Sequence, residues 1–267
     1  MKGNLMRSTI GKDPKRRRGV YLIPNVLTSG NLFSGLFAIL AVFNANYVAA
    51  AIAILVALVF DVLDGMSARL MNGTSQFGVE YDSLADLVSF GVAPGLLIYS
   101  WALSGHGMLG SAVMFAFVAC GALRLARYNV MAASAEGKYF TGLPIPAAAS
   151  VIATLVVFDH HIVRMGEGVK PLLILIMTLA LAFLMVSTIK YRSFKDLKFR
   201  GGSHFNYLVW AILGLMLVVA WPEVMPFVLL AGYAVSGVIE KGVSLLAKPL
   251  GKRGGTKSDQ AVSETKQ

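Results

Sequence analysis

The 267-residue sequence is poor in charge, has a single cysteine, and lacks the phosphate-binding motifs of common soluble enzymes. Charged side chains make up 14% of it, whereas a soluble domain carries about a quarter. Hydrophobic residues make up 56%, and the mean hydropathy is +0.68. This balance excludes an ordinary soluble protein and predicts a membrane protein with several spans. Neither a P-loop nor a glycine-rich dinucleotide fingerprint is present, so neither of those nucleotide sites is expected.

The residues that usually build disulfides and transition-metal sites are also scarce. Cys120 stands alone in an apolar run, which excludes a disulfide framework and favours a small core residue. The four histidines fall near the ends of apolar segments, and none has metal-ligand spacing with Cys or Glu. A zinc or copper site of the usual kind is therefore not expected.

Long apolar runs predict an all-α fold, a polytopic bundle of about eight transmembrane helices. The last two predicted spans are separated by Pro222. The predicted spans are about 25–43, 47–63, 84–103, 108–125, 145–163, 171–189, 207–221 and 224–246.

The distribution of lysine and arginine supports this count and orients the chain. With eight spans and a cytoplasmic N-terminus, every basic residue except Arg164 and Lys170 falls on the cytoplasmic side. Such a bias is what the positive-inside rule requires. It accounts for the net charge of +10 without a nucleic-acid partner. We expect a bacterial inner (cytoplasmic) membrane, with both termini in the cytoplasm.

The two ends of the chain differ from the apolar middle. Residues 1–22 form a basic arm that we expect to lie on anionic lipid, with Tyr21, Leu22 and Ile23 anchoring a short interfacial segment. The long basic region argues against a cleavable signal. Residues 23–247 form the predicted membrane domain, and 248–267 lack apolar periodicity and are predicted to be a disordered tail.

Four aspartates interrupt the apolar pattern in the stretch FDVLDGMSARLMNGTSQFGVEYDSLADLVSFG, residues 60–91. Asp61 and Asp64 are three apart and share one helix face, and Asp82 and Asp86 are four apart and share another. The intervening Asn72-Gly73 pair predicts a turn. An antiparallel helix pair would therefore bring all four carboxylates together, at the cytoplasmic end of the bundle.

Four carboxylates in one small space repel each other unless positive charge compensates them. Oxygen-only ligands suit Mg²⁺, Mn²⁺ or Ca²⁺, and two such ions can clamp a phosphate. Gly65, Ala68 and Gly78 leave room for a bulky ligand beside the helices. Two other interpretations stay open: carboxylates solvated at the interface, and an ion or proton pathway in a transporter.

These residues complete a known pattern. Asp61-x-x-Asp64-Gly65-x-x-Ala68-Arg69, followed by Gly78-x-x-x-Asp82-x-x-x-Asp86, resembles the full signature of the CDP-alcohol phosphatidyltransferase family. Enzymes of this family move a phosphatidyl group from a CDP-linked lipid to an alcohol and release CMP. The resemblance implies a membrane-embedded transferase, and also a homodimer.

The resemblance also implies a role for each matched position. Asp61, Asp64, Asp82 and Asp86 would ligate two divalent metal ions, and Asp86 would also be the general base for the acceptor hydroxyl. The residues expected to bind the CDP-lipid are Asp61, Gly65, Ala68, Arg69 and Gly78 of the signature, and Asn25, Thr28 and Asn31 of the first span. The last three have a second interpretation, as hydrogen-bonding groups between helices.

Four further stretches resemble the branch of this family that uses L-serine as the acceptor. They are IPNVLTSGNLFSG, CGALRLARYNV, YFTGLPIPAAA and LMVSTIKYRSFKDL. The implied reaction joins L-serine to the phosphatidyl group of CDP-diacylglycerol and gives phosphatidylserine. Glycerol phosphate, inositol and choline remain alternative acceptors.

Candidate serine ligands follow from the charge of the acceptor. Serine carries a carboxylate, for which arginine is a preferred planar partner. Arg124 and Arg127 are three apart on the fourth predicted span, and Asn129 is nearby. We expect one of the arginines, with Asn129, to hold the serine carboxylate. The alternative is that both arginines anchor the span or contact a lipid headgroup.

Overall fold

A computed structural model describes residues 22–70, 75–133, 142–164, 169–189 and 204–246. The secondary structure of these residues is entirely helical, as the apolar pattern predicts. The basic arm, the Asn72-Gly73 turn and the C-terminal tail lie outside the described residues, so the structure does not test those predictions.

The described residues form a series of helices along the chain. In chain order they are α2 (Leu22–Phe43), α3 (Tyr47–Leu70), α4 (Gln76–Asp86), η1 (Leu87–Val92), α5 (Ala93–Ile98), η2 (Tyr99–Leu103), η3 (Ser104–His106), α6 (Gly107–Ala133), α7 (Ile145–Phe158), η4 (Asp159–Val163), α8 (Lys170–Val186), α9 (His204–Ala220) and α10 (Met225–Leu246). Of the short elements, η1, η2 and η4 are π-helical and η3 is a 3₁₀ turn.

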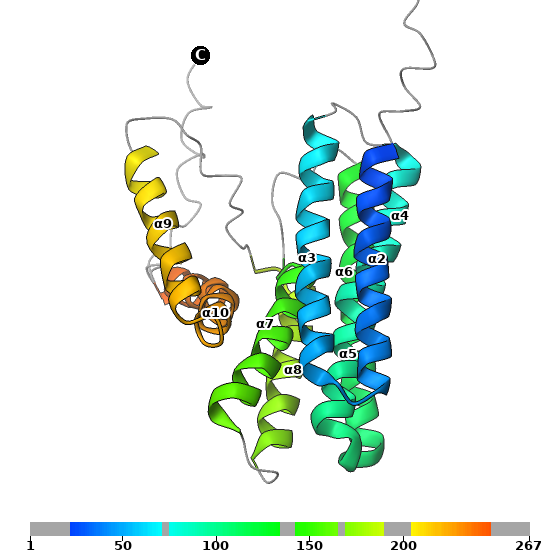
Figure 1. The fold of residues 1–267 in the computed structure, drawn as a ribbon, viewed down its shortest axis with the longest axis vertical. Helices are drawn as coiled ribbons and strands as arrows, with labels where there is room; N and C mark the ends of the chain where they lie inside the picture. The colour runs from blue at the N-terminus through cyan, green and yellow to red at the C-terminus, as the bar shows by residue number, and fades with distance from the viewer. Residues whose placement is uncertain (1–21, 71–74, 134–141, 165–168, 190–203, 247–267) are drawn as a thin grey trace, which may run out of the picture.

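The first helices form an antiparallel bundle (Figure 1). The chain reverses after α2 at residues 44–46 and again near Gly107, whose φ of 53° a glycine adopts without strain. The run from α4 to η3 therefore descends along the bundle, and α6 returns beside it. As a result, the end of α3 and the start of α4 lie at the same end of the molecule.

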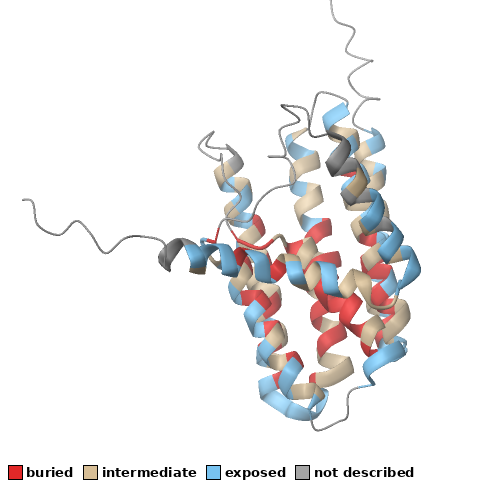
Figure 2. Ribbon diagram, turned by 90° about the vertical axis from the view of Figure 1, so that its left-hand side faces the viewer, coloured by how far each residue is buried: buried red, intermediate tan, exposed pale blue. Residues whose placement is uncertain are grey.

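Small side chains allow the helices to approach closely. The buried residues of α2 and α3, which pack on each other, include the alanines Ala38, Ala41, Ala50, Ala51, Ala53 and Ala57. Small residues are typical of helix contacts in a membrane, where close packing rather than apolar burial drives association. Figure 2 shows the buried residues inside the bundle and the exposed ones on its outer surface. Those outer residues are largely apolar, as a lipid-facing surface requires.

The structure supports a polytopic membrane protein. Five helical segments are long and apolar enough to cross a membrane: Leu22–Phe43, Tyr47–Leu70, Gln76–Met131, Ile145–Val163 and Met225–Val243. The third segment includes both the descending run from α4 to η3 and the returning helix α6, which the sequence predicts as two spans. Helix α8 is apolar but has only 17 residues. The eight predicted crossings are therefore not confirmed.

Helix α10 runs across the bundle rather than along it, as Figures 1 and 2 show from two directions. It packs against α7, and its Ala234 is buried there. Hydropathy predicts an apolar helix in this part of the chain but carries no information on its direction.

Candidate active site

Three of the four predicted carboxylates come together inside the bundle. Asp61 projects from α3, and Asp82 and Asp86 project from successive turns of α4. One carboxylate oxygen from each lies within 4.8 Å of the others. Helix α4 begins at an N-cap, where the backbone N–H of Gly78 donates to Ser75 Oγ at 2.9 Å. It ends at Asp86, after which the backbone becomes π-helical, a distortion common at functional sites.

The fourth carboxylate, Asp64, is held separately. Thr28 of α2 donates a hydrogen bond to Asp64 Oδ2, and both side chains are buried. Asp64 lies outside the group of three, although it is close enough to Asp61 and Asp82 to interact with their charges. Its orientation thus depends on α2 as well as on α3.

Asn31 supports the most buried carboxylate of the cluster. Its side-chain nitrogen donates to Asp86 Oδ1 at 2.9 Å, and the Asn31 side chain is fully buried. Ser89 of η1 in turn donates from Oγ to the Asn31 carbonyl at 3.0 Å. Thr28 and Asn31 therefore act as hydrogen-bonding groups between helices, which is one of the two interpretations of their spacing.

A glycine contact permits this arrangement. A Cβ added at Gly35 would lie 2.3 Å from Ser89 Oγ and 2.7 Å from Ser89 Cα, so any larger residue would separate α2 from η1. The sequence prediction does not include Ser89 or Gly35. The one signal available was their spacing: Ser89 is three residues after Asp86, and Gly35 is four residues after Asn31, each on the same helix face.

The oxygen atoms of this cluster are suitable ligands for a divalent cation. Among the described residues, Asp82 Oδ1 and Asn31 Oδ1 are buried without a hydrogen-bond partner. A buried oxygen without a partner is unfavourable, and three neighbouring carboxylates repel one another. Carboxylate and amide oxygens are the ligands that Mg²⁺ and Mn²⁺ prefer. A cation between the carboxylates would relieve both penalties.

The residues predicted to bind the CDP-lipid lie on α2, α3 and α4, the helices that carry the carboxylates and their hydrogen-bond partners. A Cβ added at Gly78 would lie 3.5 Å from Asn25 Oδ1, so α2 and α4 face each other here. Arg69 donates from Nε to the Gly65 carbonyl at 2.7 Å, and both residues are exposed. Only Arg69 would come within 4 Å of a Cβ at Gly65, among the contacts of the described residues. The surface of α3 near Gly65 is therefore open.

The three predicted serine ligands have different surroundings. Arg124 interacts electrostatically with Asp86, Tyr128 and Tyr233, and its Nε is buried without a hydrogen-bond partner in the described part of the chain. Arg127 instead donates from Nη1 to the Val186 carbonyl at 3.3 Å, which ties α6 to the end of α8. Arg124 is therefore close enough to Asp86 for their charges to interact.

Asn129 belongs to a network between α6 and α4. Its side-chain nitrogen donates to Ser83 Oγ at 3.0 Å and to Glu80 Oε2 at 3.4 Å. These partners lie on α4, the helix that carries Asp82 and Asp86. In this arrangement Asn129 holds two helices together, and its amide would have to leave Ser83 to reach a ligand.

Fold and site together define a polytopic helical membrane protein with a carboxylate centre inside its bundle. The chain belongs to the CDP-alcohol phosphatidyltransferase family, whose model matches residues 21–236. This match confirms the resemblance carried by the eight signature residues.

Three individual relatives are similar to the chain over most of its length. The chain is 37% identical over 220 residues to a CDP-diacylglycerol–serine O-phosphatidyltransferase of Helicobacter pylori, covering 82% of this chain and 91% of the relative. It is 38% identical over 173 residues to the Bacillus subtilis protein of the same name, covering 65% and 91%. An archaetidylserine synthase of Methanothermobacter thermautotrophicus is 38% identical over 171 residues, covering 63% and 69%.

Proposed function

We propose that this protein transfers the phosphatidyl group of CDP-diacylglycerol to the hydroxyl of L-serine, giving phosphatidylserine and CMP. The observation that carries the proposal is the convergence of Asp61, Asp82 and Asp86, three signature positions of the family, in one cluster. The names of the relatives supply the acceptor, because two of those described above are serine transferases and the third is an archaetidylserine synthase.

In the proposed reaction the serine hydroxyl oxygen attacks the phosphorus that bears the diacylglycerol. The bond from that phosphorus to the bridging oxygen breaks, and CMP leaves with the electron pair. Asp86 accepts the proton of the hydroxyl, since a neutral alcohol is a weak nucleophile and needs a positioned base. Asn31 fixes Asp86 through Oδ1, which leaves Oδ2 for the proton.

Asp61, Asp64, Asp82 and Asp86 would hold divalent ions, two Mg²⁺ or Mn²⁺ in the proposal, with Ca²⁺ as the alternative. Bound there, the ions neutralise the diphosphate and stabilise the charge of the departing CMP. Thr28 fixes the orientation of Asp64 by donating to its Oδ2. Arg69, on the exposed turn after Gly65, would contact the nucleotide phosphates. The open surface at Gly65 would leave space for the CDP head, and Ala68, Gly78 and Asn25 would line its pocket.

For the acceptor, we propose that Arg124 binds the serine carboxylate. Its guanidinium interacts with Asp86, so a carboxylate placed on it brings the serine hydroxyl close to the base. An Arg124→Lys enzyme should show a raised KM for serine with little change in the KM for CDP-diacylglycerol, because lysine cannot replace a planar two-point contact. Arg127→Lys is the matched control. A serine KM that is unchanged beside a raised lipid KM would reject this role.

The reaction is tested by identifying the product. Purified protein is incubated with CDP-diacylglycerol, a divalent ion and, separately, serine, glycerol phosphate, inositol or choline, and the lipids are analysed by mass. Phosphatidylserine formed only with serine supports the proposal. Efficient transfer to another alcohol would replace the acceptor, and the absence of any metal-dependent CMP release would favour an ion-coupled transporter.

We further propose that residues 23–247 cross a cytoplasmic membrane several times, with the active site and both termini in the cytoplasm, and that the protein assembles as a homodimer. Because Cys120 is the only cysteine, Cys120→Ser gives a background for labelling. A Ser258→Cys variant in that background should react with an impermeant maleimide only after the membrane is opened. Labelling in sealed cells would reverse the orientation. Light scattering of the protein in detergent tests the dimer.

A further inference from the structure

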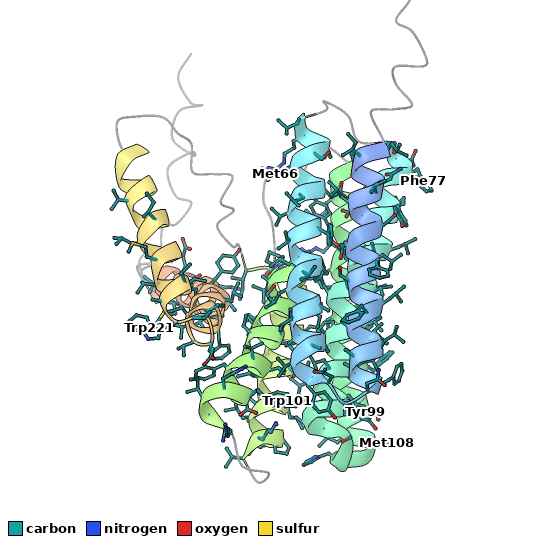
Figure 3. All side chains as sticks on the ribbon, viewed as in Figure 1. Met66, Phe77, Tyr99, Trp101, Met108 and Trp221 are labelled. Atoms are coloured by element: carbon teal, nitrogen blue, oxygen red, sulfur yellow. The ribbon has the colours of Figure 1, made fainter. Side chains whose placement is uncertain are left out.

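A second polar site lies at the opposite end of the bundle from the aspartates. A cavity of about 580 Å³ opens between the turn after α2, η2, η4 and the start of α8. The charged residues that line it are Asp159, Arg164 and Lys170, together with His160. Figure 3 shows Trp101, another lining residue, at the end of the molecule away from Met66 and Phe77, which lie in sequence between Asp64 and Asp82.

A buried ion pair fixes one cation at the cavity wall. Lys170 Nζ lies 3.2 Å from Asp159 Oδ2, and Asp159 is 4% exposed. The same nitrogen lies 4.0 Å from the centroid of the Trp101 ring. The buried carboxylate is thereby neutralised, and the ammonium is held in place against an aromatic surface.

Arg164 is a second cation at the cavity, and it takes no part in the ion pair between Lys170 and Asp159. It is exposed, lines the cavity, and makes no ion pair with the described residues. Its φ of +47° places it at the C-cap of η4, where its backbone N–H donates to the Asp159 carbonyl at 2.8 Å. Arg164 and Lys170 are also the two basic residues that the sequence places away from the cytoplasmic side.

We propose that this cavity binds a phosphate group through Arg164 and Lys170, either as the headgroup of a phospholipid in the leaflet opposite the active site or as free phosphate. Arginine and lysine together with amide donors form the usual contacts to phosphate oxygens. Asn44 and Asn46 supply such amides; Asn46 uses Oδ1 to accept from the Ala49 N–H, which leaves its nitrogen free to donate. Trp101 and Tyr47 belong to the aromatic residues found at membrane surfaces.

Trp101 provides a local probe for the test. In a Trp210→Phe, Trp221→Phe background it is the only tryptophan of the full-length protein. Its fluorescence is followed in detergent during titration with phosphatidylglycerol, with diacylglycerol, which has the same tails but no phosphate, and with inorganic phosphate. We expect a saturable change with phosphatidylglycerol and none with diacylglycerol. A response to inorganic phosphate as well would identify free phosphate as a ligand.

An arginine variant makes the result decisive. Arg164→Gln should weaken the response at least about tenfold, the cost of a lost charged hydrogen bond, while Lys241→Gln on α10 removes a charge elsewhere and should leave it unchanged. CMP release by Arg164→Gln should equal that of the parent, which shows that the variant is folded. Equal affinity in Arg164→Gln and the parent, or no saturable response to either phosphate ligand, would overturn the proposal.

Discussion

Replacing Asn31 by leucine tests whether the hydrogen bond to Asp86 supports the chemistry. Leucine has a similar size and suits a fully buried position, but it cannot donate to the carboxylate 2.9 Å away. A hydrogen bond to a charged group contributes about 1.5–3 kcal/mol, and each 1.4 kcal/mol, roughly, is a tenfold change in rate. If the bond holds Asp86 in its reactive orientation, kcat should fall about ten- to 150-fold.

The assay is CMP release from purified protein at saturating CDP-diacylglycerol, serine and Mg²⁺. Ser29→Ala is the matched control on the same helix, since the Ser29 hydroxyl makes exposed contacts to Tyr81 and to the Asn25 carbonyl. Its effect should stay within about twofold, as for other exposed substitutions. The melting temperature of each variant separates lost chemistry from lost folding. An Asn31→Leu enzyme as active as Ser29→Ala would refute the reasoning.

The remaining predictions concern the base, the packing and the metal. Asp86→Asn should abolish CMP release while the protein keeps its melting temperature, because the amide cannot accept the proton; retained activity would remove Asp86 as the base. Gly35→Ala should lower the melting temperature and activity together, by about 1–3 kcal/mol of stability, since its Cβ would overlap Ser89. Gly105→Ala is its control, because an added Cβ there would have no heavy atom within 4 Å. Equal melting temperatures of the two variants would contradict the close contact at Gly35. Chelation with EDTA should stop CMP release, and Mg²⁺ or Mn²⁺ should restore it; activity that persists under chelation would exclude the divalent centre.

Local spacing accounts for the part of the site that the sequence predicts. Asp82 and Asp86 share a helix face because they are one turn apart, and Asp61 joins them because consecutive helices run antiparallel. Composition likewise predicts the all-helical fold and the apolar outer surface. The helical fold and the apolar surface can be predicted without knowing which residues of distant helices are in contact.

The partners of these side chains could not be predicted in the same way. The spacing of Thr28 and Asn31 is the same whether their side chains contact a nucleotide or a carboxylate. In the structure they donate to Asp64 and Asp86, and the close approach of α2 to η1 at Gly35 permits this. Nothing in the sequence near Asn129 indicates its partners. It donates to Ser83 and Glu80 because α6 packs beside α4.

The sequence by itself determined that this chain is a helical membrane protein and predicted that four aspartates share its candidate site, because hydropathy and helical periodicity act within a few residues. The tertiary structure alone decided that Asp61, Asp82 and Asp86 form one group while Asp64 is held by Thr28, that the charge of Arg124 interacts with Asp86, and that α10 crosses the bundle. These features depend on the distances and angles between helices, which are set by the packing of many small side chains and are not encoded in any single segment.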